Sequence, residues 1–266
     1  RVPTMTQLVD LIAINELLGT VESSGDGKNA NLVAQLETES LAAKAAEFQT
    51  TNNDDTIGWI RIPNTNVDYP VVYKAGVENY AYYESKGYDK QYSKDGVIWA
   101  DYECTFPELS QNTTLYGHNW HNIYTPRTQA NMQANDLMFS LVMSYNYTDF
   151  AQENPFIYFS TTEQDYVFQV FASYYTDLNF GYNYAQMSQE DFQKVIAEAK
   201  AKSLSNYNVP VTSEDKIVTL STCTRVHGNT NNQRFVVMAK LVPVGTPSTT
   251  ISTHSNPIAY NSSIDA

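Results

Sequence analysis

Two runs of apolar and β-branched residues near the C-terminal end of the chain, separated by a polar loop, constrain its fold most strongly. The runs span Ile217–Leu220 and Phe235–Val242, and the residues between Cys223 and Arg234 are rich in Asn, Thr and Gly. This pattern predicts a β-hairpin with a long loop.

Pairing Cys223 with Arg234 would divide the side chains of this hairpin between two faces, because side chains alternate along a strand. One face carries Thr219, Ser221, Cys223, Arg234, Val236 and Met238. The other face, expected to be the core, carries Val218, Leu220, Phe235, Val237, Ala239 and Leu241. A thiol and a guanidinium then meet at the open end of the sheet.

Cys223 is a candidate nucleophile, because the thiolate is the reactive form and a fixed cation lowers the pKa of a thiol from about 8.5. Arg234 could also stabilise an oxyanion. Since arginine cannot act as a base, acyl transfer would need a proton-transfer group, and His118 is the candidate. Taken alone, a Cys and an Arg near strand ends are more often a buried core residue and a surface charge.

The motifs around these residues resemble the active-site hairpin of sortases. They are TLSTC at Thr219–Cys223, whose serine is similar to that of class B, and QRFVV at Gln233–Val237. The resemblance continues in the family's order through GWIRIPNTNVDYPVVY (Gly58–Tyr73), ENYAYYE (Glu78–Glu84), DGVIWADY (Asp95–Tyr102) and LYGHN (Leu115–Asn119).

The resemblance implies a cysteine transpeptidase that joins surface proteins to the cell wall without a cofactor or metal. Cys223 would attack the threonine carbonyl of a C-terminal sorting motif of the Asn-Pro-X-Thr or a related type. Arg234 would stabilise the oxyanion and His118 would transfer the protons. A peptidoglycan amine, or a pilin lysine in a pilus-assembling sortase, would then accept the acyl group.

The resemblance also implies a mostly β fold, a closed sortase-type barrel with two N-terminal helices and a helix inserted before the strand that carries Cys223. We expect an N-terminal helical appendage over 1–53 packed on the barrel, a catalytic barrel over 54–244 and a C-terminal tail over 245–266. The tail is rich in Ser, Thr and Pro, which predicts a mobile segment.

Apolar spacing predicts the helices in more detail. The first N-terminal helix would span residues 8–18, and the second would run from about Asn31 to Phe48 with a stripe of Leu32, Leu36, Ala43 and Ala46. A further helix would cover Leu137–Val142 after a cap at Asn135 or Asp136. The inserted helix would begin with a capping box of Ser188 and Asp191 and bury Phe192, Val195, Ile196 and Ala199.

The substrate groove has five candidate residues: Ser221, Asn79, Tyr83, Tyr182 and Tyr184. Ordinary packing would explain the tyrosines equally well. His118 directly follows a strand, where Gly117 permits close backbone approach and Asn119 could orient the ring.

Three other histidines are weaker candidates for proton transfer. His121 and His227 fall in loops and His254 falls in the tail. Loops and tails hold a catalytic group less firmly than a strand end.

Composition limits the partners. The net charge of −13 disfavours nucleic acid or an anionic membrane surface as a partner. The two cysteines form no disulfide framework, and we expect Cys104 and Cys223 to be unbonded. No apolar run is long enough to span a membrane. The resemblance implies the extracellular face of the cell membrane, with an N-terminal anchor that this sequence does not contain.

Two other classes of protein remain open from the residues alone. A hydrolytic cysteine peptidase would use the same thiol, although it does not need an arginine at the opposing strand position. An extracellular β module without enzymatic activity would use Cys223 only as a core residue.

Overall fold

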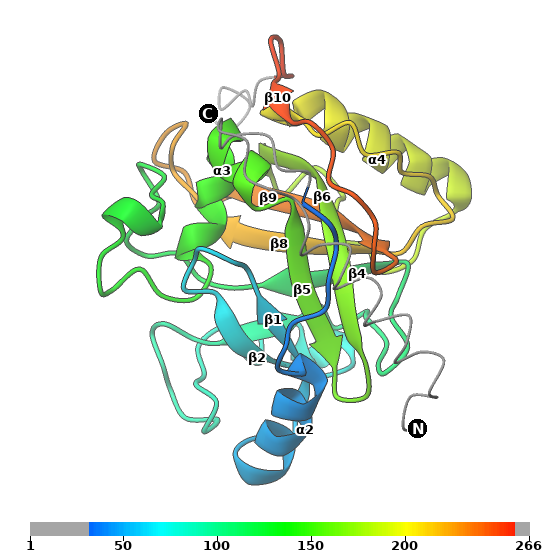
Figure 1. Ribbon diagram of the computed structural model, residues 1–266. Helices are drawn as coiled ribbons and strands as arrows, with labels where there is room; N and C mark the ends of the chain where they lie inside the picture. The colour runs from blue at the N-terminus through cyan, green and yellow to red at the C-terminus, as the bar shows by residue number, and fades with distance from the viewer. Residues whose placement is uncertain (1–31, 259–266) are drawn as a thin grey trace, which may run out of the picture. The chain divides into compact units, whose positions relative to one another are not determined.

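Eight strands form a closed barrel in the computed structural model, which describes residues 32–258 (Figure 1). In order around the barrel they are β1 (Thr56–Arg61), β2 (Asp68–Val72), β3 (Ile98–Ala100), β4 (Asn112–Tyr116), β8 (Ile217–Cys223), β9 (Gln233–Val242), β6 (Asp165–Asp177) and β5 (Phe156–Thr161). The pairs β2–β3 and β4–β8 are parallel and the other pairs are antiparallel. The predicted closed, mostly β barrel is confirmed.

The hairpin β8–β9 has the predicted register, with Cys223 paired to Arg234. The prediction of a single core face is wrong, because Val236 and Met238 on the other face are also fully buried. Tyr182 hydrogen bonds to Ser221 on that face, and helix α4 packs on the neighbouring strand β6. Both faces of the hairpin are therefore covered, which makes its open end a rigid support.

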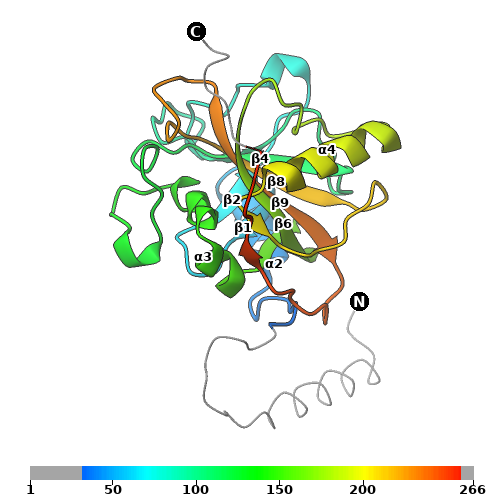
Figure 2. The ribbon, with the colours of Figure 1, turned by 90° about the horizontal axis from the view of Figure 1, so that it is seen from above.

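Helix α4 (Gln189–Lys202) is the predicted helix inserted before the strand that carries Cys223. The side chain of Ser188 accepts a hydrogen bond from the Asp191 backbone N–H, which ends the preceding loop and starts the helix. Its buried residues are Phe192, Ile196 and Ala199, as the apolar stripe predicts, whereas Val195, the fourth member of the predicted stripe, is only partly buried against the core. Both views place α4 beside β6 (Figures 1 and 2).

Helix α2 spans Leu41–Thr51. Its first residue, Leu41, lies ten residues after the predicted start at Asn31. The Ser40 side chain caps it by accepting from the Ala43 backbone N–H. The predicted stripe is wrong: Leu32 and Leu36 are 39% and 46% exposed, whereas the helix buries Leu41, Ala42 and Ala45. The predicted helix over residues 8–18 lies outside the described residues.

The segment after the barrel is not a mobile tail over residues 246–258. The Ala34 backbone N–H donates to the Thr246 carbonyl at 2.8 Å, and β10 (Ser252–Thr253) pairs with β7 (Ser205–Asn206). Ile251 is buried against the core. The composition is misleading here because backbone pairing, not side-chain periodicity, holds the segment. Residues 259–266 lie outside the described residues.

The chain between β4 and β5 also differs from the prediction. Instead of a helix over Leu137–Val142, a 3₁₀ helix spans Ser140–Asn146 and is followed by α3 (Thr148–Glu153). Met138 has φ of +53°, which an α-helix does not allow. Further 3₁₀ turns span Val77–Asn79 and Gln129–Asn131.

Candidate active site

Strand register brings His118, Cys223 and Arg234 together at the ends of three neighbouring strands. In the parallel pair β4–β8, Tyr116 lies opposite Ser221. Two residues further along the chain are Cys223, the last residue of β8, and His118, which follows the end of β4, and both side chains line the same cleft. On the other side of Cys223, β9 places Arg234 opposite it. The thiol therefore lies between an imidazole and a guanidinium.

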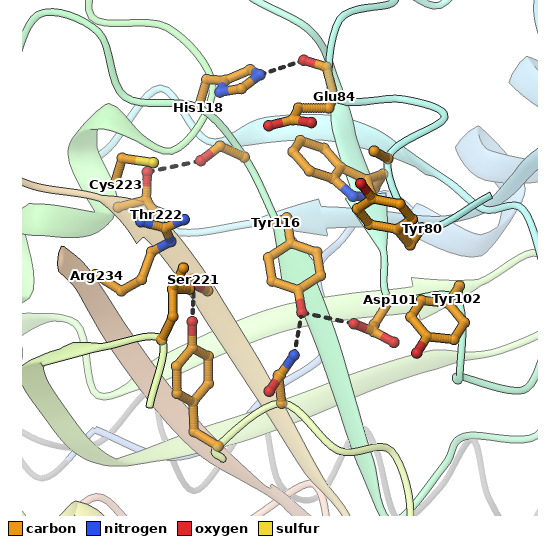
Figure 3. Close-up of a pocket in the computed structure, with 16 residues that line it drawn as sticks. Tyr80, Glu84, Asp101, Tyr102, Tyr116, His118, Ser221, Thr222, Cys223 and Arg234 are labelled. Atoms are coloured by element: carbon orange, nitrogen blue, oxygen red, sulfur yellow. Dashed lines mark hydrogen bonds between the residues drawn. The ribbon is translucent and has the colours of Figure 1, made fainter. Parts of the chain in front are cut away.

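The three side chains line one cleft of about 280 Å³ at this end of the barrel. Figure 3 shows His118, Cys223 and Arg234 at one end of the cleft and Asp101 and Tyr102 at the other, all lining the same space. A cleft that is lined by both polar and apolar side chains from several segments suits an extended peptide.

The backbone around Cys223 is fixed against the strand that leads to His118. The Thr222 hydroxyl donates to the Gly117 carbonyl at 2.8 Å, and the Asn119 side-chain amide donates to the Cys223 carbonyl at 3.3 Å. Gly117 is needed at its position, because a Cβ there would lie 2.5 Å from Ile98 Cδ1. The close approach predicted for Gly117 is thus confirmed. The prediction that Asn119 orients the His118 ring is wrong, since its amide holds the cysteine backbone instead.

His118 is held by a carbonyl and by aromatic rings. Its Nε2 lies 2.5 Å from the Glu84 carbonyl oxygen. The imidazole stacks on Trp120 with centroids 5.1 Å apart and planes at 29°, and it lies 5.6 Å from the Trp99 ring. The ring therefore has a defined orientation beside the cleft.

Arg234 anchors itself through a single nitrogen. Its Nη1 donates to the carbonyl oxygens of Asn231 and Gln233, each at 2.9 Å. A guanidinium has five N–H groups in a fixed plane, so these two contacts leave the N–H groups on Nη2 and Nε of a residue that lines the cleft for other partners.

The predicted substrate-binding residues fall into two groups. Ser221 and Tyr182 line the cleft, and their hydroxyl oxygens lie 2.9 Å apart. Burial raises the pKa of the Tyr182 phenol, which therefore stays neutral near neutral pH.

The other three candidates, Asn79, Tyr83 and Tyr184, are not among the residues that line the cleft. Their predicted place in its wall is therefore wrong. Tyr83 is 1% exposed and donates its hydroxyl to the Asp55 carboxylate at 2.6 Å, so it ties two loops together. The Asn79 amide donates to the Ala75 carbonyl within its own turn. Tyr184 is 54% exposed. The sequence pattern cannot separate these tyrosines, because a phenol suits a groove and a core equally well.

Sequence reasoning missed a polar network at the other end of the cleft. The Tyr116 hydroxyl donates to the Asp101 carboxylate at 2.7 Å and accepts from the Asn183 amide at 2.9 Å. Burial raises the pKa of Asp101, while the Glu103 backbone N–H and Tyr116 act in the opposite direction. The signal for Tyr116 was available, since it lies two residues before His118 and so shares its face of the strand.

The other histidines lie away from the cleft. His121 is exposed. His227 packs its ring against Tyr175 at 4.6 Å, and burial lowers its pKa. The His254 Nδ1 lies 2.7 Å from the Ser203 carbonyl oxygen. Among the described residues that line the cleft, His118 is the only histidine.

Both cysteines are free thiols, as predicted. Cys104 is 2% exposed, and burial raises its pKa to about 12, so it remains a neutral core thiol. Within residues 32–258, no group of three or more His, Cys, Asp or Glu side chains could hold a metal ion.

Comparison with known proteins places nearly all of the barrel in one family. The model of the Sortase domain family matches residues 60–242. The chain is 31% identical over 193 residues to sortase B of Staphylococcus aureus, covering 72% of each chain. It is 29% identical over 191 residues to sortase B of Listeria monocytogenes, covering 71% of each.

Solved structures agree with this relationship. A Staphylococcus aureus sortase B–substrate complex superposes with a TM-score of 0.63 at 28% identity, covering 78% of this chain and 88% of that chain. Sortase B of Clostridium perfringens superposes with a TM-score of 0.60 at 26% identity, covering 74% and 98%. The chain therefore belongs to the sortase family of cysteine transpeptidases, as a member of class B.

Proposed function

We propose that this sortase cleaves a sorting motif of the Asn-Pro-X-Thr or a related type and transfers the acyl group to a peptidoglycan amine, with Cys223, His118 and Arg234 as its catalytic residues. The observation that carries the proposal is that these three side chains, at the ends of neighbouring strands, line one cleft. One similar solved structure is a sortase B–substrate complex and another is a sortase B complexed with triglycine. A glycine peptide ends in a primary amine, which is the kind of acceptor we propose.

In the first half-reaction the Cys223 thiolate attacks the threonine carbonyl and a C–S bond forms. The negative charge moves to the carbonyl oxygen, where the N–H groups of Arg234 stabilise it. The His118 imidazolium then donates its proton to the leaving amine, the C–N bond breaks and a thioester remains.

In the second half-reaction the acceptor amine attacks the thioester carbonyl and His118 takes the proton from the attacking nitrogen. An amide bond forms, the C–S bond breaks and Cys223 leaves as a thiolate. The proton balance closes with His118 as imidazolium and Cys223 as thiolate, which is the starting state.

Ser221 and Tyr182 are the residues that we propose to contact the peptide next to the thiol. They line the cleft on the face that carries Cys223. For the place of action we propose the outer surface of the cell membrane, from family membership alone. Over residues 32–258 the structure contains no helix with the length and apolar character needed to cross a membrane.

The test combines a sorting-motif peptide with an amine acceptor and uses mass spectrometry to detect the thioacyl adduct and the transfer product. Cys223→Ala should form no adduct, and His118→Ala should lose transpeptidation. His121→Ala and His254→Ala, which remove histidines outside the cleft, serve as matched controls and should keep most of it. A fully active His118→Ala variant would overturn the catalytic assignment.

The acceptor is tested separately. A glycine peptide should accelerate consumption of the thioacyl adduct and appear in the product, whereas pilin subunits should not form covalent ladders. Ladders with pilin subunits would identify a pilus-assembling sortase. If the thioacyl adduct is hydrolysed at a rate that no added amine changes, the protein is a peptidase.

A further inference from the structure

The imidazole of His118, which lines the cleft, is contacted by three groups that lie outside β4, and we call these groups the His118 clamp. The clamp consists of the Glu84 carbonyl, the Trp120 ring and Gly96. The carbonyl oxygen lies 2.5 Å from Nε2, and the Trp120 ring is stacked on the imidazole. Gly96 lies so close that a Cβ on it would be 2.8 Å from His118 Cδ2. Figure 3 shows His118 and Glu84 facing each other at the cleft.

The contact with Glu84 decides which ring nitrogen carries a hydrogen. A backbone carbonyl oxygen can only accept a hydrogen bond, so Nε2 of His118 must be the donor. Nε2 then keeps its hydrogen in the neutral and in the protonated ring. Only Nδ1 can gain and lose a proton while this contact is made.

We infer that the His118 clamp fixes the Nε2–H tautomer, so that Nδ1 is the atom that gives the proton to the leaving amine and takes it from the acceptor amine. The inference rests on the proposed role of His118 in proton transfer. Trp120 is a positioning residue in this scheme, because it touches the imidazole. It is absent from the lining of the cleft.

The clamp is anchored independently of His118. The Trp120 indole N–H donates to the Lys94 carbonyl at 2.9 Å, and the Lys94 ammonium lies 5.6 Å from the centroid of the Trp120 ring. The Glu84 backbone N–H donates to the Ala81 carbonyl. A half-turn of the imidazole would place Cε1 against the Glu84 oxygen and lose the hydrogen bond. The ring is therefore held in one of its two flipped orientations.

The segment that supplies the clamp is itself fixed by charge. Asp55, just before β1, forms ion pairs with Lys74 at 3.0 Å and with Lys90 at 3.1 Å, and accepts a hydrogen bond from Tyr83. These three contacts attach the loop of residues 73–97 to Asp55 at three points along its length. Glu84, Lys94 and Gly96 lie on this loop. The orientation of the imidazole thus depends on a loop that is distant in sequence from His118 and Cys223.

Kinetics of Trp120 variants test the positioning role. In Trp120→Leu we expect kcat to be about tenfold lower. Proton transfer by a well-placed side chain accelerates a reaction by about 10²- to 10⁴-fold, and this variant loses only part of the placement of His118. KM for the sorting peptide should stay within about twofold, because Trp120 is not among the residues lining the cleft. Trp120→Phe, which keeps a stacking ring, should recover most of kcat. Tyr124→Leu, which removes an exposed aromatic from the same loop, should behave as wild type.

The tautomer is read directly by ¹⁵N NMR of histidine-labelled protein, with the His118 signals identified by their loss in His118→Gln. At a pH where the ring is neutral, Nε2 should carry the hydrogen and Nδ1 should not. In Trp120→Leu the two tautomers should mix. An Nδ1–H tautomer in the wild type, or unchanged kcat in Trp120→Leu, would overturn the inference.

Failure of the inference and failure of the proposed function give different results. A fully active His118→Ala variant would refute the proposed role of His118 in proton transfer, whichever tautomer the ring adopts. An inactive His118→Ala variant together with an Nδ1–H resting tautomer leaves the catalytic assignment in place and refutes only the clamp.

Discussion

Arg234 holds its own position through Nη1 and presents the rest of its guanidinium to the cleft. A lysine at this position has one nitrogen, which cannot both bind the two loop carbonyls and reach an oxyanion. We therefore expect Arg234→Lys to lose about 10²-fold or more in kcat, the range seen when a single oxyanion donor is removed. Initial-rate kinetics with the sorting peptide measure this loss.

Arg225→Lys is the matched control for that prediction. Arg225 lies in the same β8–β9 loop, its Nη2 contacts the Asn231 side chain at 2.5 Å, and it does not line the cleft. This control should keep wild-type kcat. If Arg234→Lys is as active as wild type, the role of the arginine is only to supply positive charge.

The two thiols should differ strongly in reactivity. Cys104 is 2% exposed, and its raised pKa, about 12, keeps it protonated, whereas Cys223 is half-buried at the cleft. A thiol reagent at neutral pH should modify one cysteine in the folded, unreduced protein and two after denaturation. Peptide mapping should place the fast-reacting group on Cys223. Two thiols of equal reactivity in the folded protein would contradict the buried position of Cys104.

Residue-level predictions from the sequence succeeded where partners are close along the chain. The Cys223–Arg234 pair follows from one hairpin, whose register can be read from its two strands. Tyr83 was placed wrongly in the groove because its partner, Asp55, lies in a different segment and nothing in the motif marks the contact. The sequence also could not show that the Asn119 amide reaches the Cys223 carbonyl.

At the scale of elements, one long-range pairing explains two errors. Residues 32–34 and 246–248 hydrogen bond to each other, including a bridge between Val33 and Pro247. Because of this pairing, residues 32–34 are extended and do not form the start of a helix. For the same reason, residues 246–248 are ordered and do not form a mobile tail. The helical spacing of Leu32 and Leu36 is coincidental, since this segment is extended and neither side chain is buried.

The loop after His118 is fixed by a buried ion pair. Arg127 Nη1 lies 2.7 and 2.9 Å from the two carboxylate oxygens of Asp136, which is fully buried. Arg127→Met should lower the free energy of unfolding by about 3 kcal/mol, because it leaves a buried carboxylate without its cation. Urea denaturation measures the change.

The double variant Arg127→Met with Asp136→Asn separates charge from packing. Removing the carboxylate charge as well should return part of the lost stability, so the double variant should be more stable than Arg127→Met alone. A double variant that is less stable than the single one would show that the Asp136 hydrogen bonds, including the one from the Gln133 backbone N–H, matter more than its charge.

At the scale of the whole barrel, the C-terminal segment is part of the folded unit. Ile251 is 7% exposed and belongs to the main core, and its backbone N–H donates to the Gln152 side chain at 2.7 Å. Ile251→Ala should lower the free energy of unfolding by about 2 kcal/mol. Ile258→Ala, at a position 54% exposed, should change it by less than about 0.5 kcal/mol. Equal midpoints for both variants in urea would show that the segment does not stabilise the barrel.

The parallel pairing of β4 with β8 has a consequence for the time at which the enzyme becomes reactive. The hydrogen bond between Thr222 and Gly117 joins residues 105 positions apart, which directly precede the proposed nucleophile, Cys223, and the proposed proton-transfer group, His118. A chain that is synthesised from its N-terminus contains His118 long before it contains Cys223. Incomplete chains that end before β8 therefore carry His118 without Cys223, and the thiol that they do carry, Cys104, is a core residue of the folded protein and does not line the cleft.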